Sequence, residues 1–223
     1  WATSDRHGVV RDCEIENLGS DPVQLELVDG LQNILPAGTP GVVQASASNL
    51  VNAYKWTELD RSSRLAIYAL YAGISDRAEP CESLRANVVY GLGLERATVL
   101  LSSLQLDDFR RGVALVPEDH KRGIRGAYFL GTRLDLARGG VQRWKIVADV
   151  ERTQAQVVDL IRLLAEPAAL GSAVEESVAS GRDALTRIVA AAVGRGQRGA
   201  ASPASSAPAS SSGPTWSAWV VST

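Results

Sequence analysis

Amide, carboxylate and aromatic residues gather in one stretch of this sequence, at residues 28–60. They include Asp29, Gln32, Asn33, Asn49, Asn52, Tyr54, Trp56 and Glu58. Amides and carboxylates supply the paired donors and acceptors that hydroxyl groups need, and flat aromatic rings stack on the apolar faces of sugars. Glycines and prolines interrupt the same stretch, and a long connection of this kind is costly to order. We therefore predict a working loop over residues 29–58 that faces a sugar, a neighbouring subunit or another domain.

Tyr54 and Trp56 are the aromatic pair of this stretch. Residues at positions i and i+2 of a strand project to the same face, so both rings are expected on one side of the sheet. Stacking on a ligand and packing within the protein are the two interpretations of such a pair. We expect Trp56 to be partly exposed at the edge of a sheet.

Paired carboxylates are the residues that glycoside cleavage would require. One carboxylic acid protonates the leaving oxygen while a second carboxylate acts from the opposite side of the sugar. The pairs available are Asp107 with Asp108, Glu118 with Asp119, and Glu79 with Glu82. All three lie in charge-rich, turn-like segments, where solvated surface charges are the ordinary explanation. No catalytic residue is assigned.

The remaining residues that could hold a metal, a cofactor or an anion are Cys13, Cys81, His7, His120, Gly91, Gly93 and two basic clusters at residues 110–111 and 121–125. The cysteines and histidines have no partner at a zinc-ligand or catalytic-triad spacing. The two glycines lack the third glycine and the helix start of a dinucleotide fingerprint. No metal and no cofactor are predicted. The basic clusters could grip a phosphate or a carboxylate, or could be plain surface charges.

Composition excludes several classes of function. The chain has 223 residues and a formal net charge of −2, which predicts no attraction to nucleic acid or to an anionic membrane. No apolar run approaches the length of a membrane span. The sequence starts at Trp1, contains no Met and shows no signal peptide, so we expect an internal piece of a longer protein. The compartment stays open, with the cytoplasm favoured.

Alternating apolar and polar residues predict the elements that position these side chains. Period-two or continuously apolar runs indicate strands at residues 23–27, 64–72, 84–94, 97–106, 126–136 and 141–150. Arg138-Gly139-Gly140 is typical of a hairpin turn between the last two. The glycines at positions 91 and 93 suggest a bulge or a close backbone approach. Strands at this spacing favour an antiparallel β-sandwich over residues 1–150.

The pattern changes to helical periodicity after residue 150. Thr153 and Gln156 have the spacing of a capping box, an apolar stripe follows, and Pro167 ends it. Ser172 and Glu175 repeat the start signal before a second stripe that includes Val174, Val178, Leu185, Ile188 and Val189. Such stripes ordinarily pack on a core, although the pair also suits a connector to another domain. Residues 151–193 are therefore predicted to be a helical linker, and residues 194–223 a low-complexity disordered tail.

Several segments together resemble a known family. The segments DGLQNILPAG, SNLVNAYKWTELD and ISDRAEPCESLRA, with the succession RGAYFL…RWKIVADVERTQAQV, resemble the N-terminal region of cellobiose-phosphorylase-like glycoside phosphorylases. The resemblance implies a large antiparallel "super-sandwich", helical linker segments, and a following (α/α)₆ barrel that carries inverting phosphorolysis. The acid and most phosphate-binding residues would belong to that barrel.

The sequence thus predicts a mainly β protein with a helical addition. The expected function is that of a non-catalytic sandwich domain of a carbohydrate-active enzyme, inactive alone, which supports the catalytic barrel and its interface. The alternative is a free-standing carbohydrate-binding or adhesion module. Expected partners are the barrel, carbohydrate and a second subunit, and neither nucleic acid nor a membrane. The helices favour the first interpretation, and the Ser/Pro-rich tail favours the second.

Overall fold

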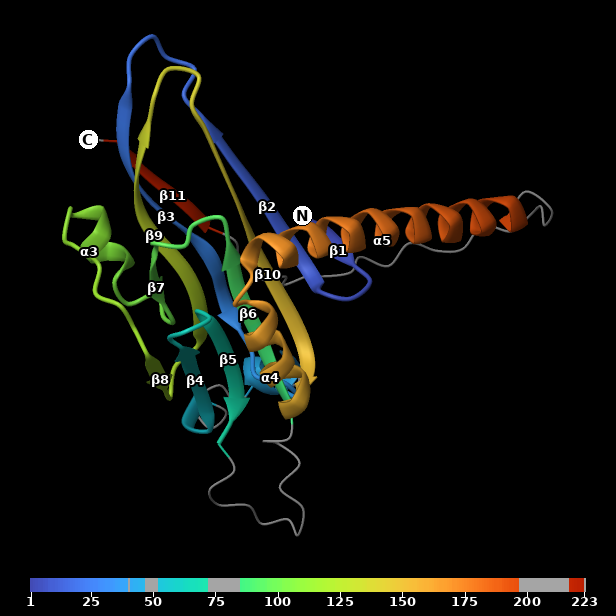
Figure 1. The fold of residues 1–223 in the computed structure, drawn as a ribbon. Helices are drawn as coiled ribbons and strands as arrows, with labels where there is room; N and C mark the ends of the chain where they lie inside the picture. The colour runs from blue at the N-terminus through green and yellow to red at the C-terminus, as the bar shows by residue number, and fades with distance from the viewer. Residues whose placement is uncertain (40, 47–51, 72–84, 197–216, 223) are drawn as a thin grey trace.

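The computed structural model describes residues 1–39, 41–46, 52–71, 85–196 and 217–222 (Figure 1). Within them the chain is mainly β with antiparallel sheets, as the sequence predicts. The strands are β1 (Ala2–Ser4), β2 (Gly8–Glu16), β3 (Val23–Ile34), β4 (Lys55–Asp60), β5 (Leu65–Leu70), β6 (Arg85–Leu92), β7 (Thr98–Leu100), β8 (His120–Arg122), β9 (Gly126–Leu136), β10 (Val141–Thr153) and β11 (Ser217–Ser222). The helices are α1 (Gly41–Ser46), α3 (Leu106–Arg110), α4 (Gln154–Leu163) and α5 (Pro167–Gly196).

The strands form two sheets. The larger sheet has seven strands in the order β1-β2-β10-β6-β5-β4-β8, and the smaller has four in the order β11-β3-β9-β7. The core between them is built from alternate residues of both, including Leu27, Tyr128 and Leu130 of the smaller sheet and Tyr68 and Ile146 of the larger. Period-two patterning in the sequence reflects this two-layer packing, because each strand turns every second residue inward.

The connection between β9 and β10 corrects the predicted hairpin. The turn at residues 138–140 is present, but β9 pairs with β3 and β7 whereas β10 pairs with β2 and β6, so the two strands lie in different sheets. The connection between β2 and β3 crosses between the sheets in the same way. Asn17 joins the two crossings, since its backbone N–H donates to Gly140 at 3.0 Å and its carbonyl accepts from Gly139 at 3.0 Å. These connections are arches rather than hairpins (Figure 1).

The predicted strand over residues 97–106 is shorter than expected. Only Thr98–Leu100 is extended, and Leu106 begins α3. The buried carboxylate of Glu118 explains the early end, because it accepts from Leu101 N at 2.8 Å and from Ser102 Oγ at 2.9 Å. These bonds fold the segment back over the outer face of the smaller sheet, where Leu106 and Phe109 pack with Phe129.

Helix α4 and the start of α5 cover part of the outer face of the larger sheet. Thr153 caps α4 through the predicted capping box with Gln156. Val157 and Leu160 of α4, with Leu170 and Val174 of α5, pack against strand residues such as Val88 and Val147. The apolar stripe of α4 is therefore the face that the helix buries against the sheet.

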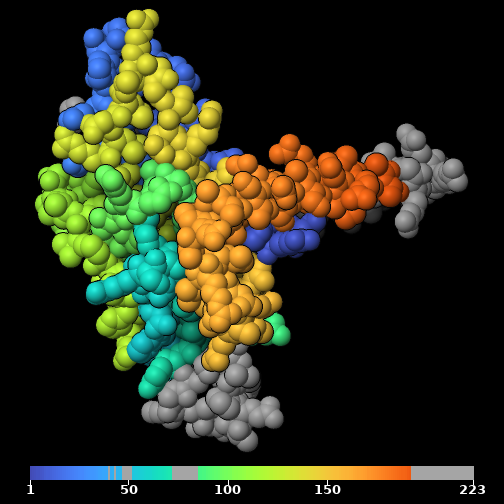
Figure 2. All heavy atoms as spheres, in the orientation of Figure 1, coloured from blue at the N-terminus to red at the C-terminus, as the bar shows by residue number. Residues whose placement is uncertain are grey.

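The second half of α5 projects away from the sheets (Figures 1 and 2). Its residues Leu185, Ile188 and Val189 are exposed, so the second stripe packs on the core only in its first turns. The start signal at Ser172 is wrong: α5 begins at Pro167, which suits the first helical position because no N–H is needed there. The Ser172 hydroxyl instead donates to the carbonyl of Ala168 within the helix.

The end of the chain also differs from the predicted tail. Helix α5 continues to Gly196, and Ser217–Ser222 forms β11, which pairs antiparallel with β3. The remaining residues of the predicted tail lie outside the described residues. None of the helices in the described part of the chain is long and apolar enough to cross a membrane.

Candidate functional site

The predicted loop over residues 29–58 is not one loop. Strand β3 runs to Ile34 and β4 begins at Lys55, so both ends of the stretch belong to strands. The two strands lie in different sheets, and their faces point in different directions. The predicted site residues are therefore divided between the core and the surface.

Asp29 lies in the core and corrects the expectation of a surface ligand. It is fully buried on β3, where its Oδ1 forms an ion pair with Arg11 Nη2 at 2.7 Å. Its Oδ2 accepts from Trp144 Nε1 at 2.7 Å and from Cys13 Sγ at 3.3 Å. We call Asp29, Arg11, Trp144 and Cys13 the inner cluster. Partial burial, together with the nearby Asp29 charge, raises the pKa of the Cys13 thiol to about 12, so the thiol is a half-buried donor rather than a nucleophile.

The other predicted residues in and beside the connection do not converge on one point. Gln32 is half-buried on β3. Asn33 has a φ of 58° at a register shift of that strand, a conformation that asparagine tolerates, and its Oδ1 accepts from Arg125 at 3.4 Å. Tyr54 is exposed ahead of β4. Asn49 lies outside the described residues.

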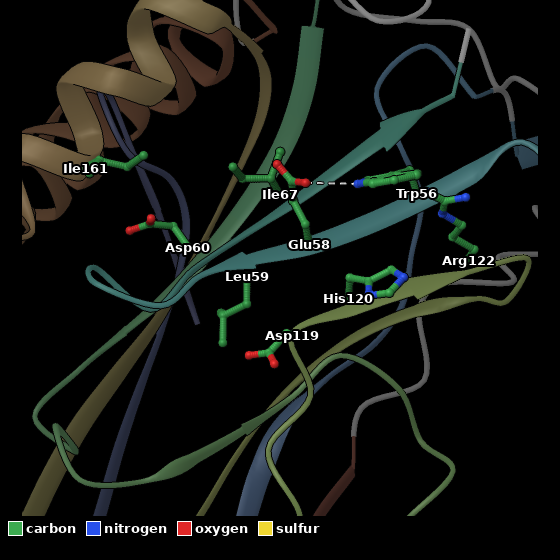
Figure 3. A pocket seen from close by; sticks show the side chains of 9 residues that line it. All are labelled: Trp56, Glu58, Leu59, Asp60, Ile67, Asp119, His120, Arg122 and Ile161. Atoms are coloured by element: carbon green, nitrogen blue, oxygen red, sulfur yellow. Dashed lines mark hydrogen bonds between the residues drawn. The ribbon is translucent and has the colours of Figure 1, made fainter. Parts of the chain in front are cut away.

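Trp56 and Glu58 are brought together on the outer face of the larger sheet. They are two residues apart on β4 and so share one face, and Trp56 Nε1 donates to Glu58 Oε2 at 3.0 Å. They line a shallow surface cleft of about 560 Å³, which we call the Trp56 cleft (Figure 3). Its other lining residues are Leu59, Asp60, Ile67, Asp119, His120, Arg122 and Ile161. Strands β4, β5 and β8 form the floor, and Ile161 of helix α4 borders the cleft.

Aromatic and cationic groups surround the Trp56 ring. Tyr71 stacks beside it, with 5.7 Å between ring centroids and 20° between planes. The His120 ring centre lies 5.9 Å away, and the Arg122 guanidinium carbon lies 3.7 Å above the indole. Arg122 is the residue paired with Trp56 across β4 and β8, so strand register places the cation over the ring. Trp56 is half-buried, and part of its indole stays accessible.

The carboxylates of the cleft are engaged as acceptors. Asp119 accepts from Arg61, through Nε at 2.8 Å and through a second guanidinium nitrogen, and these hydrogen bonds lower its pKa. Partial burial opposes ionisation of Asp60, but hydrogen bonds from Ser63 and Ser62 outweigh it and lower the pKa of that carboxyl. A general acid for glycoside cleavage needs the opposite shift. The cleft therefore offers hydrogen-bond acceptors and a stacking surface rather than a proton donor.

The other carboxylate pairs of the sequence have structural or surface roles. Asp107 and Asp108 form i,i+3 ion pairs with Arg110 and Arg111 on the exposed helix α3. Glu118 is buried and holds the segment after β7. The pair at positions 79 and 82 lies outside the described residues, as does Cys81. Among the residues that the structure describes, no group of three or more His, Cys, Asp or Glu side chains could hold a metal ion.

The sequence did not predict that Tyr71, His120 and Arg122 lie around the Trp56 ring. His120 and Arg122 are two residues apart and so share one face of a strand. Strand β8 has only three residues, however, and lies in a segment rich in charge, so its sequence gives little indication of a strand. Tyr71 directly follows a strand whose apolar content suggested burial throughout. Only the register of β4 against β8, which pairs Trp56 with Arg122 and Glu58 with His120, shows that these side chains meet.

No family model and no curated protein matches this sequence. The resemblance to cellobiose-phosphorylase-like enzymes accordingly stays a prediction that rests on the sequence segments quoted above. The geometry of the Trp56 cleft is therefore the observation that bears most directly on function.

Proposed function

We propose that this chain is a non-catalytic β-sandwich domain of a carbohydrate-active enzyme of the glycoside-phosphorylase kind, and that the Trp56 cleft contacts carbohydrate. The half-exposed Trp56 indole carries the proposal. It is surrounded by hydrogen-bonding groups on an open, rigid strand surface. An aromatic ring supplies the stacking surface for a pyranose, and Glu58, Asp119 and His120 supply donors and acceptors for its hydroxyls.

Arg122 and a stacked sugar would compete for the same face of the Trp56 ring. Its guanidinium lies over the Trp56 ring, where a cation–π contact at an exposed site contributes about 0.5–1 kcal/mol. A sugar that stacks on the same ring face displaces this group at small cost, because Arg122 is exposed and its side chain is long. The displaced guanidinium can then donate to the ligand's hydroxyls.

The projecting helix supports the role of a domain within a larger enzyme. Leu185, Ile188 and Val189 form an exposed apolar stripe beyond the sheets, as expected for a segment that packs against a further domain such as the (α/α)₆ barrel. A second subunit would be an alternative cover for this stripe. In both arrangements the chain supports catalysis elsewhere and is expected to be inactive alone.

The alternative is a free-standing carbohydrate-binding or adhesion module, which the Ser/Pro-rich segment of residues 201–214 favours. A free-standing module binds sugar equally well with and without further domains. A domain that shares its site with the barrel binds more tightly in the full-length protein, so comparing the two affinities separates the candidates.

Indole N–H resonances of Trp56 and Trp144 provide the test. Oligosaccharides are titrated into ¹⁵N-labelled chain, beginning with β-linked glucose disaccharides and their longer homologues. We expect a saturable shift at Trp56 and none at Trp144, which is buried and donates to Asp29. Trp56→Ala should abolish the response, and Tyr54→Ala, which removes an exposed ring outside the cleft, should retain it. A response that survives Trp56→Ala, or none with any oligosaccharide, contradicts the proposal.

A further inference from the structure

Lys55 is a buried lysine at the start of β4. Its residue is only 2% exposed, and Lys55 and Trp56 alternate along the strand, so they project to opposite faces of the sheet. The Lys55 ammonium donates to Asn52 Oδ1 at 2.9 Å and to Gln44 Oε1. Both partners come from the connection between β3 and β4. Lys55 is therefore held by neutral amides on the side of the sheet opposite to the Trp56 cleft.

In the described part of the chain, no carboxylate compensates the charge of Lys55. Among the described residues, no Asp or Glu forms an ion pair with its Nζ, and its electrostatic neighbour is another cation, Arg125. Burial and then the Arg125 charge lower the pKa of Lys55 to about 8. Lys145 shows the contrast: it pairs with Asp12 at 2.9 Å and Glu175 at 3.2 Å, and its pKa is raised. A buried charge without an opposite partner is costly.

Gln44 adds a second group that lacks a partner. An ammonium group can only donate, so Gln44 must present its Oε1 to Lys55, and this fixes the orientation of the amide. Its Nε2 is buried, and among the residues that the structure describes it has no hydrogen-bond acceptor. The Nε2 donor is one carbon away from the oxygen that Lys55 contacts, so two donors lie side by side, and no described carboxylate forms an ion pair with Lys55. Buried polar groups are ordinarily satisfied, which makes this pair an exception that requires an explanation.

We propose that Lys55 and Gln44 bind one oxygen of a small oxyanion group, a phosphate, sulfate or carboxylate, on the core side of β4. Such an oxygen accepts from Lys55 Nζ and Gln44 Nε2 and supplies the missing negative charge. Arg125 adds attraction without contact and remains bonded to Asn33. This site is separate from the Trp56 cleft and goes beyond the proposed function, because its ligand is recognised by charge rather than by stacking.

Lysine-selective labelling gives a direct test, since the chain contains only three lysines, at positions 55, 121 and 145. Signals of the ε-methylene and ammonium groups are followed while sodium phosphate, sulfate or acetate replaces chloride at constant ionic strength. We expect a saturable shift at Lys55 with at least one oxyanion, an increase in the pKa of Lys55 on binding, and no saturable shift at Lys145. Response to phosphate and sulfate alone assigns a tetrahedral ligand, and response to acetate alone assigns a carboxylate.

Two variants make the test specific. Gln44→Glu places a carboxylate beside Lys55, so it should raise the Lys55 pKa and weaken oxyanion binding by at least about tenfold. Lys55→Met should abolish binding, whereas Lys145→Met, the matched control, should leave it unchanged. If Lys55→Met does not fold, Gln44→Glu still decides the question. Absence of a saturable Lys55 shift with all three anions, or an equal shift at Lys145, overturns the proposal.

Discussion

Two regions of this molecule combine the same three side-chain groups, an indole, a carboxylate and a guanidinium, in different surroundings. In the inner cluster, Trp144 donates its indole N–H to Asp29, and Arg11 pairs with the same carboxylate. In the Trp56 cleft, Trp56 donates to Glu58, and Arg122 lies over the indole. Asp29 is fully buried, whereas Glu58 is exposed. The same hydrogen bond therefore stabilises the fold in the first region and leaves surface groups available for a ligand in the second.

Removal of the two carboxylates should show the largest difference. Asp29→Ala leaves the Arg11 guanidinium without its counter-charge, although it still donates to the Gly30 carbonyl at 3.2 Å, and removes the acceptor of the Trp144 N–H. The change should lower the free energy of unfolding by about 3–5 kcal/mol. Glu58→Ala should change it by no more than about 0.5 kcal/mol, because water replaces the lost acceptor. Urea unfolding of both variants measures the difference. Equal losses would show that the two regions do not differ in the way described.

Replacement of each tryptophan by phenylalanine isolates the indole N–H. Trp144→Phe leaves a buried carboxylate short of one donor, and should lower the free energy of unfolding by about 1–3 kcal/mol. Trp56→Phe keeps a ring in the cleft and should leave stability within about 0.5 kcal/mol. Thermal and urea unfolding provide the measurement. A larger loss for Trp56→Phe would make Trp56 a packing residue and would remove the main support for a ligand surface.

Lys55 extends the comparison to a buried charge without a counter-charge. The pKa of Lys55 is about 8 in the folded chain and returns to its ordinary value of 10.5 on unfolding. Between these values the unfolded state binds more protons, so stability should rise with pH, and the full gain would be about 1–3 kcal/mol. Below pH 8 both states are protonated and the penalty is fully present.

Urea unfolding between about pH 7.5 and about pH 9.5 measures the slope below the range in which unfolded tyrosines ionise. Lys55→Met should remove this rise and leave the smaller fall in stability near pH 9 that the raised pKa of the Cys13 thiol causes, because the unfolded thiol loses its proton first. A rise with pH that persists in Lys55→Met would assign the effect to other groups.

The smallest effect is expected at Arg122. Arg122→Ala removes a cation–π contact at an exposed site and should lower the free energy of unfolding by no more than about 1 kcal/mol. The Trp56 indole resonance should shift in the same variant, because the guanidinium no longer lies over the ring. Arg133→Ala, which removes an exposed guanidinium bonded to Gln24, is the matched control and should leave Trp56 unchanged. An unshifted Trp56 signal in Arg122→Ala would contradict the observed geometry.

Local patterns in the sequence predict the type of most elements but not their partners. Alternation predicts β5, β6, β9 and β10, and the Thr153 capping box predicts the start of α4. The sheet that each strand joins depends on pairing between distant residues, which explains why an arch was expected to be a hairpin. The partial exposure of Trp56 follows from its position on an alternating strand near an edge.

The candidate site was predicted only in part, for the same reason. Asp29 was expected on the surface because the sequence predicts a working loop that begins at residue 29, whereas β3 continues to Ile34. Its partner Trp144 is 115 positions away in the sequence, and no local pattern links the two. His120 and Arg122 were missed because β8 has three residues, too few to show periodicity. Sequence thus identified Trp56 and Glu58, and strand register supplied the rest.

The two arches have a consequence for how this chain folds. Because β2 and β3 lie in different sheets, they do not pair with each other, and apart from the short pairing of β2 with β1 their partners are distant: Val10 pairs with Val147, and Leu27 pairs with Thr132. Folding rates fall as contacting residues lie farther apart along the chain, so assembly of these sheets is expected to be slow. During synthesis the N-terminal strands must wait with unpaired edges until β9 and β10 have left the ribosome. Chaperone dependence in the cell would follow from the arches, and a chain truncated before residue 126 should aggregate rather than fold.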